Sequence, residues 1–284
     1  MAFATSRALR RARLGFALLV WVAPAWASAE LTHRYSFNDG TAADSVGAAH
    51  GVPVNGPQIN NGRVHFANPG FVNDPLVGKY IDLPNQIART PALTLETWVT
   101  YVGVGLFEEI ASFGTGTAGE LQPGTPNPAT GGVIGTDYVA LIPNLNGWLT
   151  GTLRNTGALE QPLRGTNPQA LPQNSEHHVA YTVDYPNRIA ALYLDGAEIG
   201  RRTISIDPSQ FDQVNDWLAR SQWSPDAFFN GSINEFRIYD AALSPGEVAA
   251  SFARGPDVVP EPSTSLALTV AGLALLRRTR GTRR

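Results

Sequence analysis

The 284-residue chain contains no cysteine, which excludes disulfide bonds, thiolate metal sites and cysteine nucleophiles together. Charged residues are also scarce, at 16% of the chain. Glycine and proline are instead abundant, with 28 and 21 residues, and 43% of all residues are apolar. This balance is typical of many strands joined by turns around a packed core. The composition therefore predicts an all-β protein rather than a helical bundle.

Lysine is almost missing, because Lys79 is the one lysine of the sequence. Nine of the arginines lie in the two termini, four within residues 1–29 and five after residue 259. Without these arginines and Glu261, 12 basic residues remain against 23 acidic ones, which is a net charge near −11. We therefore expect no nucleic-acid or polyphosphate partner, since such ligands need clustered positive charge.

Several motifs with strong chemical meaning are also missing. The sequence has no H-E-x-x-H, no G-x-S-x-G and no glycine-rich phosphate loop. His177 and His178 are neighbours in a predicted strand, so their side chains point to opposite faces and cannot bind one metal ion together. We expect these histidines to have structural roles.

Residues 1–29 have the three parts of a secretion signal. Four arginines precede an apolar run over residues 14–24, and Ala27, Ser28 and Ala29 follow as a small-residue cleavage site. We expect signal peptidase to cleave before Glu30. An uncleaved membrane anchor is the alternative, although the apolar run is shorter than the ~20 residues that span a bilayer.

The other terminus combines Pro260, Glu261 and Pro262 with an apolar run over residues 266–276 and a final cluster of five arginines. Such a segment is a short membrane-inserting helix with a cationic stop on the cytoplasmic side. The order resembles the PEP-CTERM sorting signal of Gram-negative bacteria that make exopolysaccharide. The resemblance implies that a membrane-embedded exosortase recognises this motif and removes the tail, so that the chain is anchored only transiently in the inner membrane. An ordinary tail anchor is the alternative, and in both cases residues 30–259 are secreted or lie in the cell envelope.

Alternation of apolar and polar residues predicts strands throughout the middle of the chain. The most regular strand covers residues 93–101. Residues 179–183, 189–194 and 197–202 predict a meander, in which Asp195 and Gly196 suit a type I′ hairpin turn. Further strands are predicted at residues 31–37, 63–66, 80–83, 109–113, 138–142, 148–154 and 228–239.

The end of this strand-rich region carries a helix signal. Ser244, Pro245 and Glu247 form a capping box with proline at the first helical position, which predicts one short helix that ends by Gly255. A single helical turn is predicted at residues 214–218, and a long mobile loop at residues 114–136, for which the alternative is a loop that shapes a binding edge. Residues 30–255 show no repeat and no internal boundary, residues 256–259 form a linker, and residues 260–284 form the sorting signal. We expect one two-sheet antiparallel jelly-roll sandwich with one short C-terminal helix.

Several segments carry a second resemblance, over almost all of residues 30–252. HRYSFNDG with the following DSVGAAHG, then TLETWV, HHVAYTVD, LYLDG and NGSINEFRIYDAALSPGEV, occur in this order. They resemble the laminin G-like (LamG), concanavalin A-like jelly roll that is common in secreted bacterial proteins. These motifs preserve a fold more than an activity, so the resemblance implies structure and leaves the chemistry open.

Some relatives of this fold are glycoside hydrolases, which need two carboxylates across the scissile bond. The E-x-D-x-x-E pattern of laminarinase-like enzymes is absent, and Glu96 stands alone on its strand. Glu108 and Glu109 are neighbours that point to opposite faces. We therefore expect no enzymatic activity. Trp98 is expected in the core; the alternative is that it stacks on a sugar, and Trp148 is the second candidate for such a contact.

Calcium is a possible cofactor of the loop that follows the first strand. Asn38, Asp39 and Asp44 offer oxygen ligands there, and Glu235 in the last predicted strand offers another. The two aspartates are equally suited to forming turns. We expect an extracellular module that binds an exopolysaccharide, another glycan or another matrix component. The alternatives are a structural matrix protein without a small ligand and a glycan-active hydrolase with carboxylates from separate strands.

Overall fold

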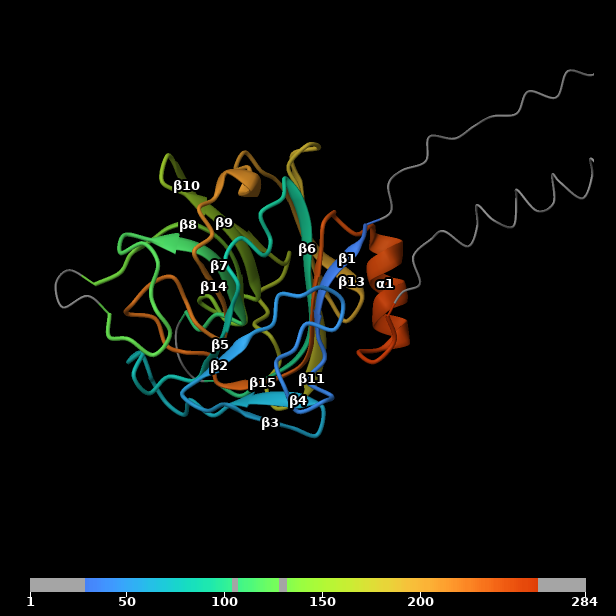
Figure 1. Ribbon diagram of the computed structural model, residues 1–284. Coiled ribbons are helices and arrows are strands. Elements are labelled where there is room, and N and C mark those ends of the chain that lie inside the picture. Colours follow the sequence, from blue (N-terminus) through green and yellow to red (C-terminus); the bar gives the residue numbers. More distant parts are fainter. Residues whose placement is uncertain (1–28, 104–106, 128–131, 260–284) are drawn as a thin grey trace, which may run out of the picture.

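The computed structural model describes residues 29–103, 107–127 and 132–259. They form two antiparallel sheets that pack face to face, with one short helix outside them (Figure 1). The predicted all-β sandwich is therefore confirmed. The signal peptide and the motif Pro260, Glu261 and Pro262 lie outside the described residues. Within the described residues no helix is long and apolar enough to cross a membrane.

The first sheet has eight strands. Its order is β13 (Ala197–Thr203), β12 (Ile189–Leu194), β11 (Glu176–Asp184), β6 (Ala92–Tyr101), β15 (Gly231–Tyr239), β4 (Arg63–Phe66) and β3 (Gln58–Asn60), and β1 (Leu31–Tyr35) also pairs with β15. The predicted meander is confirmed, and both turn residues have positive φ, 49° at Asp195 and 77° at Gly196. These values fit the hairpin turn whose twist matches the flanking strands.

The second sheet has seven strands. Its order is β10 (Ala158–Arg164), β9 (Thr150–Asn155), β8 (Gly135–Ile142), β7 (Ala111–Gly116), β14 (Asn215–Leu218), β5 (Tyr80–Leu83) and β2 (Val52–Val54). The predicted helical turn at residues 214–218 is wrong, because β14 pairs with β5 on one side and β7 on the other. The helical turn instead precedes it, as a 3-10 helix at Pro208–Gln210.

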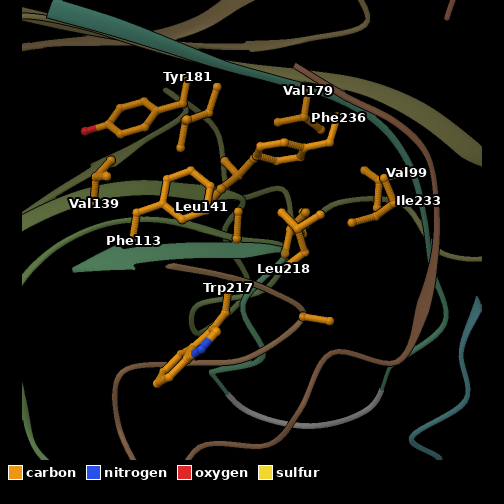
Figure 2. Packing of buried hydrophobic residues seen from close by; sticks show 14 of the residues in the cluster. Val99, Phe113, Val139, Leu141, Val179, Tyr181, Trp217, Leu218, Ile233 and Phe236 are labelled. Carbon is orange, nitrogen blue, oxygen red and sulfur yellow. The ribbon is translucent and has the colours of Figure 1, made fainter. Parts of the chain in front are cut away.

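Side chains from both sheets meet in one apolar core. From the seven-stranded sheet come Phe113, Val139 and Leu141, and from the other come Val179 and Phe236 (Figure 2). The Phe113 and Phe236 rings meet edge to face with centroids 6.0 Å apart. Burial of each such side chain contributes about 1.5–3 kcal/mol, so the alternation along each strand fixes which face turns inward.

The helix α1 (Pro245–Arg254) begins as predicted. The Ser244 side chain accepts a hydrogen bond from the backbone of Glu247, and the Glu247 side chain accepts one from the backbone of Ser244. Helix α1 lies on the outer face of the eight-stranded sheet, away from the other sheet (Figure 1). There Val248 and Leu243 pack with Tyr193 and Tyr239 in a second apolar cluster. This face of the sandwich is therefore covered.

Candidate functional site

A buried charge network lies between the eight-stranded sheet and α1. Glu96 is fully buried, and its carboxylate contacts His178 at 2.9 Å, Tyr239 at 2.9 Å and Arg237 at 3.4 Å. Arg237 also binds Glu235 at 2.6 Å. His178 and Arg237 lower the pKa of Glu96 although burial acts in the opposite direction. The protein's own groups bind most of its polar atoms, although His178 Nδ1 has no hydrogen-bond partner among the described residues, so the network mainly holds the fold.

The two tryptophans predicted as sugar-binding candidates lie in different environments, and only Trp98 contacts this network. Trp98 is only 4% exposed, with the His178 ring 4.6 Å from its centroid and the Arg237 guanidinium 4.7 Å from it. Its ring has no free face for a sugar, which corrects the stacking alternative and agrees with the expected core position. Trp148 is half-buried, in a turn whose backbone pairs it with Leu145 just before β9.

The four predicted calcium ligands do not converge. Asp44 accepts hydrogen bonds from four backbone N–H groups and from His33, and these bonds lower its pKa to about 2 against the opposing effect of burial. Glu235 binds Arg34 and Arg237, while Asn38 donates to Asp257 and Asp39 caps its own turn. Nor does any group of three or more His, Asp or Glu side chains in residues 29–103, 107–127 and 132–259 form a metal site. The main oxygens of these residues already have protein partners, so their positions do not support the predicted calcium site.

A cavity of about 270 Å³ opens on the outer face of the seven-stranded sheet. Alternation along β8 places Val139 and Leu141 in the core and turns Tyr138 and Ile142 to this outer face. The cavity is lined by Phe107, Glu109, Tyr138, Ile142, Leu145, Glu160, Trp223 and Asp226. We call this set the acidic cavity, because three of its eight side chains are carboxylic acids.

Its aromatic wall is held by hydrogen bonds between neighbouring strands and a loop. The Trp223 indole donates to the Tyr138 hydroxyl at 3.1 Å, and that hydroxyl donates to Glu160 at 3.2 Å. Thr152 of β9 donates to the same Glu160 oxygen at 3.0 Å. The Arg154 guanidinium lies 5.1 Å from the Trp223 ring centroid. The wall is therefore fixed in place, with β8, β9 and β10 supplying its contacts.

The other two acids of the cavity, Asp226 and Glu109, differ in their hydrogen bonding. Asp226 accepts a hydrogen bond from Ser221 at 2.7 Å and lies in a turn closed by its own N–H to the Trp223 carbonyl. Glu109 precedes β7 and is 2% exposed, and its Oε2 atom has no hydrogen-bond partner in the described part of the chain. A buried polar atom without a partner costs about 1–3 kcal/mol. Such an atom at a cavity wall is a point where a ligand donor would be stabilised.

Burial and mutual repulsion both act on these acids. Burial raises the pKa of Glu109 well above its usual range, and the charges of Asp226 and Glu160 act in the same direction against the hydroxyls of Ser112 and Ser221. Burial likewise raises the pKa of Asp226 to about 7, with Glu160 adding to it and Ser221 opposing it. The acids therefore favour their neutral forms until a positive group or a donor reaches them.

The predictions from sequence did not include this site. In the sequence, Glu109 is the first residue of the predicted strand at residues 109–113 and a neighbour of Glu108. Glu108 accepts a hydrogen bond from the backbone of Asn230 and does not line the cavity. Tyr138, Glu160, Trp223 and Asp226 come from three separate segments with no shared spacing. A clue in the sequence was the aromatic and acidic pair Trp223 and Asp226 within a segment that had no clear strand pattern.

Comparison with known families decides what kind of protein carries this cavity. Residues 77–249 match the Laminin_G_3 family, described as the Concanavalin A-like lectin/glucanases superfamily. The chain belongs to this superfamily. The match covers β5 to the first half of α1, so the superfamily domain includes every segment that lines the acidic cavity. No curated protein matches the sequence.

Solved structures share the fold of this superfamily member. Domain 4 of AbnA, a GH43 extracellular arabinanase from Geobacillus stearothermophilus in complex with arabinotriose, has a TM-score of 0.56 at 20% identity and covers 78% of this chain and 98% of that one. The CBM40 of the Ruminococcus gnavus IT-sialidase has a TM-score of 0.50 at 18% identity, covering 66% and 96%. The botulinum neurotoxin serotype D/C binding domain has a TM-score of 0.56 at 13% sequence identity, and the alignment covers 79% of this chain and 52% of that one. These identities establish a common fold.

Proposed function

We propose that this superfamily member is a non-enzymatic carbohydrate-binding module and that the acidic cavity is its glycan site. The observation that carries the proposal is one wall with Trp223 and Tyr138 beside three carboxyl groups. Aromatic rings stack on the C–H faces of sugars, while carboxyl oxygens accept hydrogen bonds from sugar hydroxyls. A cavity of about 270 Å³ accommodates about one sugar unit of a longer chain.

The relatives of known structure support a binding role. The AbnA domain was solved with arabinotriose, and the sialidase domain carries the name of a carbohydrate-binding module. Helix α1 packs on the outer face of the eight-stranded sheet, whereas the cavity on the outer face of the seven-stranded sheet is open to a ligand. The cavity's acids come from separate strands and loops, as the hydrolase alternative requires, so each glycan that binds is also incubated with the protein and examined for cleavage.

Replacing Trp223 by alanine is expected to weaken binding of a glycan ligand at least tenfold, about 1.4 kcal/mol, because the aromatic wall is lost. A glycan array identifies the ligand, and isothermal titration then gives the affinity of the wild type and the variant. Phe252→Ala is the control, since Phe252 is a partly exposed aromatic side chain on α1, on the other side of the sandwich. The Trp148→Ala variant tests the earlier prediction for that residue.

Unchanged binding by Trp223→Ala would move the site away from the acidic cavity. If Trp148→Ala lost binding instead, the site would lie at the turn before β9. A folded protein that binds nothing on the array would favour a structural role in the matrix.

We further propose that the chain is exported, cut before Glu30 and processed at its C-terminus by an exosortase. The backbone nitrogen of Glu30 donates to the Asp240 carboxylate at 2.8 Å, so cleavage before Glu30 would turn this bond into an ion pair with the new amino terminus. Both ends of the described chain lie beside α1 (Figure 1). Attachment through either end would therefore leave the acidic cavity free.

Mass spectrometry of the protein released by the producing cells tests this proposal. We expect an amino terminus at Glu30 and a mass that lacks the arginine-rich tail. A released or membrane-bound chain that retains residues 1–29 or 260–284 would contradict it.

A further inference from the structure

The acidic cavity has an excess of hydrogen-bond acceptors. Glu160 accepts hydrogen bonds from the hydroxyls of Tyr138 and Thr152, and Asp226 accepts one from the hydroxyl of Ser221. Glu109 Oε2 accepts no hydrogen bond from the described residues, although it is buried at the cavity wall. No lysine or arginine lines the cavity itself. The chain thus builds a concave site whose missing component is a donor with positive charge.

We propose that the acidic cavity selects a glycan unit that carries a free, protonated amine, that is, a cationic amino sugar. This inference rests on the proposed carbohydrate-binding function and names its ligand class. An ammonium group supplies three donors, which match the unpartnered Glu109 oxygen and the free acceptor positions of Asp226 and Glu160. The nearby Trp223 and Tyr138 rings add attraction, because aromatic faces bind cations.

The other two classes of sugar fit the site less well. A uronic or sialic acid would bring a carboxylate to three carboxyl groups, and Arg154, which lies over Trp223, is not among the lining residues. A neutral sugar could donate a hydroxyl to Glu109 but would bring no positive charge to stabilise the ionised forms of Glu109 and Asp226. A cation both supplies the donor and stabilises the charged carboxylates.

Proton linkage follows from the same arrangement. Without ligand, burial and like charges favour the neutral acids, and a bound ammonium group favours their charged forms. Binding therefore lowers the pKa values of Glu109 and Asp226 and releases protons near neutral pH. Affinity should rise with pH while these acids ionise and fall again once the ligand amine loses its own proton.

Three trisaccharides test the proposal by isothermal titration against the purified chain: a glucosamine trimer, its fully N-acetylated form and a galacturonic acid trimer. We expect the amine form to bind at least tenfold more tightly than the acetylated form, with proton release that shows as a dependence of the heat on buffer ionisation. Glu109→Gln should reduce this preference to less than threefold. Glu120→Gln is the control, because Glu120 is an exposed acid outside the cavity.

Equal or tighter binding of the acetylated or the acidic trimer would overturn the amine proposal and leave the glycan-binding function intact. Calcium chloride alone binding to the cavity, in a manner that Glu109→Gln abolishes, would also overturn it in favour of a metal site. If the wild type bound no glycan of any charge on the array, both the amine proposal and the proposed function would be wrong.

Discussion

Replacing Arg237 by methionine is expected to lower the free energy of unfolding by about 3–5 kcal/mol, because the change leaves buried carboxylates without their cation. Arg237 is fully buried and binds Glu235 at 2.6 Å and Glu96 at 3.4 Å. It also donates to Ser251 of α1 and to the backbone carbonyls of Pro256 and Val258. Loss of these bonds detaches the C-terminal segment from the sheet as well. Urea unfolding followed by circular dichroism measures the change.

The surface pair of Arg201 and Glu198 provides a matched control. Its side chains are 44% and 30% exposed, so Arg201→Met should cost less than about 1 kcal/mol. Adding Glu96→Gln to Arg237→Met should cost less than the sum of the two single changes, since the double variant removes one uncompensated charge. A loss below 1 kcal/mol for Arg237→Met would show that the network does not hold α1 and the sheet together.

The second large effect concerns pH. We expect the domain to lose several kcal/mol of stability between pH 5 and pH 9, because burial raises the pKa of Asp216 to about 8 with a smaller contribution from Asp82. Asp216 lies on β14 opposite Phe113 and Leu83, so its carboxyl faces the core. One oxygen accepts from the backbone of Ile87 at 3.1 Å, and the other has no partner among the described residues.

The direction in which stability changes with pH follows from the protons that the folded and unfolded states bind. The folded state holds the Asp216 proton up to about pH 8, whereas the unfolded chain releases it near pH 4, so stability falls as pH rises through this window. Asp226 and Asp82, with pKa values raised by burial to about 7 and 6, add to the fall. Asp44 acts oppositely, since its pKa is lowered to about 2 and its contribution is lost only below pH 4. Maximum stability is thus expected near pH 4–5.

The Asp216→Asn variant separates this effect from a general response to alkali. It should be several kcal/mol more stable than the wild type at pH 9 and close to it at pH 5, as measured by urea unfolding at both values. Asp212→Asn is the control, because Asp212 is exposed and only four residues away. A wild type that is equally stable at pH 5 and pH 9 would contradict the buried, protonated carboxyl.

The sequence predicted those elements whose determinants are local. The hairpin at Asp195 and Gly196 and the capping box at Ser244 depend on residues within a few positions, and both are confirmed. The strands β2, β3 and β10 were not predicted, because they are short or lie at sheet edges with weak alternation of buried and exposed residues. At β14, pairing with two neighbouring strands outweighed a weak helical pattern.

The candidate site could not be read in the same way. Glu109, Glu160 and Asp226 meet only because the folded sheet brings the segment before β7, strand β10 and the loop after β14 to one cavity, across β8 and β9. Tryptophan is a residue type that often stacks on sugars, so Trp98 was a reasonable candidate from sequence. Strand register, however, places it opposite His178 and beside Arg237. Contacts of this kind depend on long-range pairing, for which a single sequence holds no spacing signal.

The most direct test of the central claim is a crystal structure of the chain with the glycan that binds it on the array. The account predicts electron density for one sugar unit inside the acidic cavity, against Trp223 and Tyr138, with a donor group of the sugar within 3.2 Å of Glu109 Oε2. Density for the glycan on the α1 side of the sandwich, or at Trp148 with the cavity empty, would contradict it.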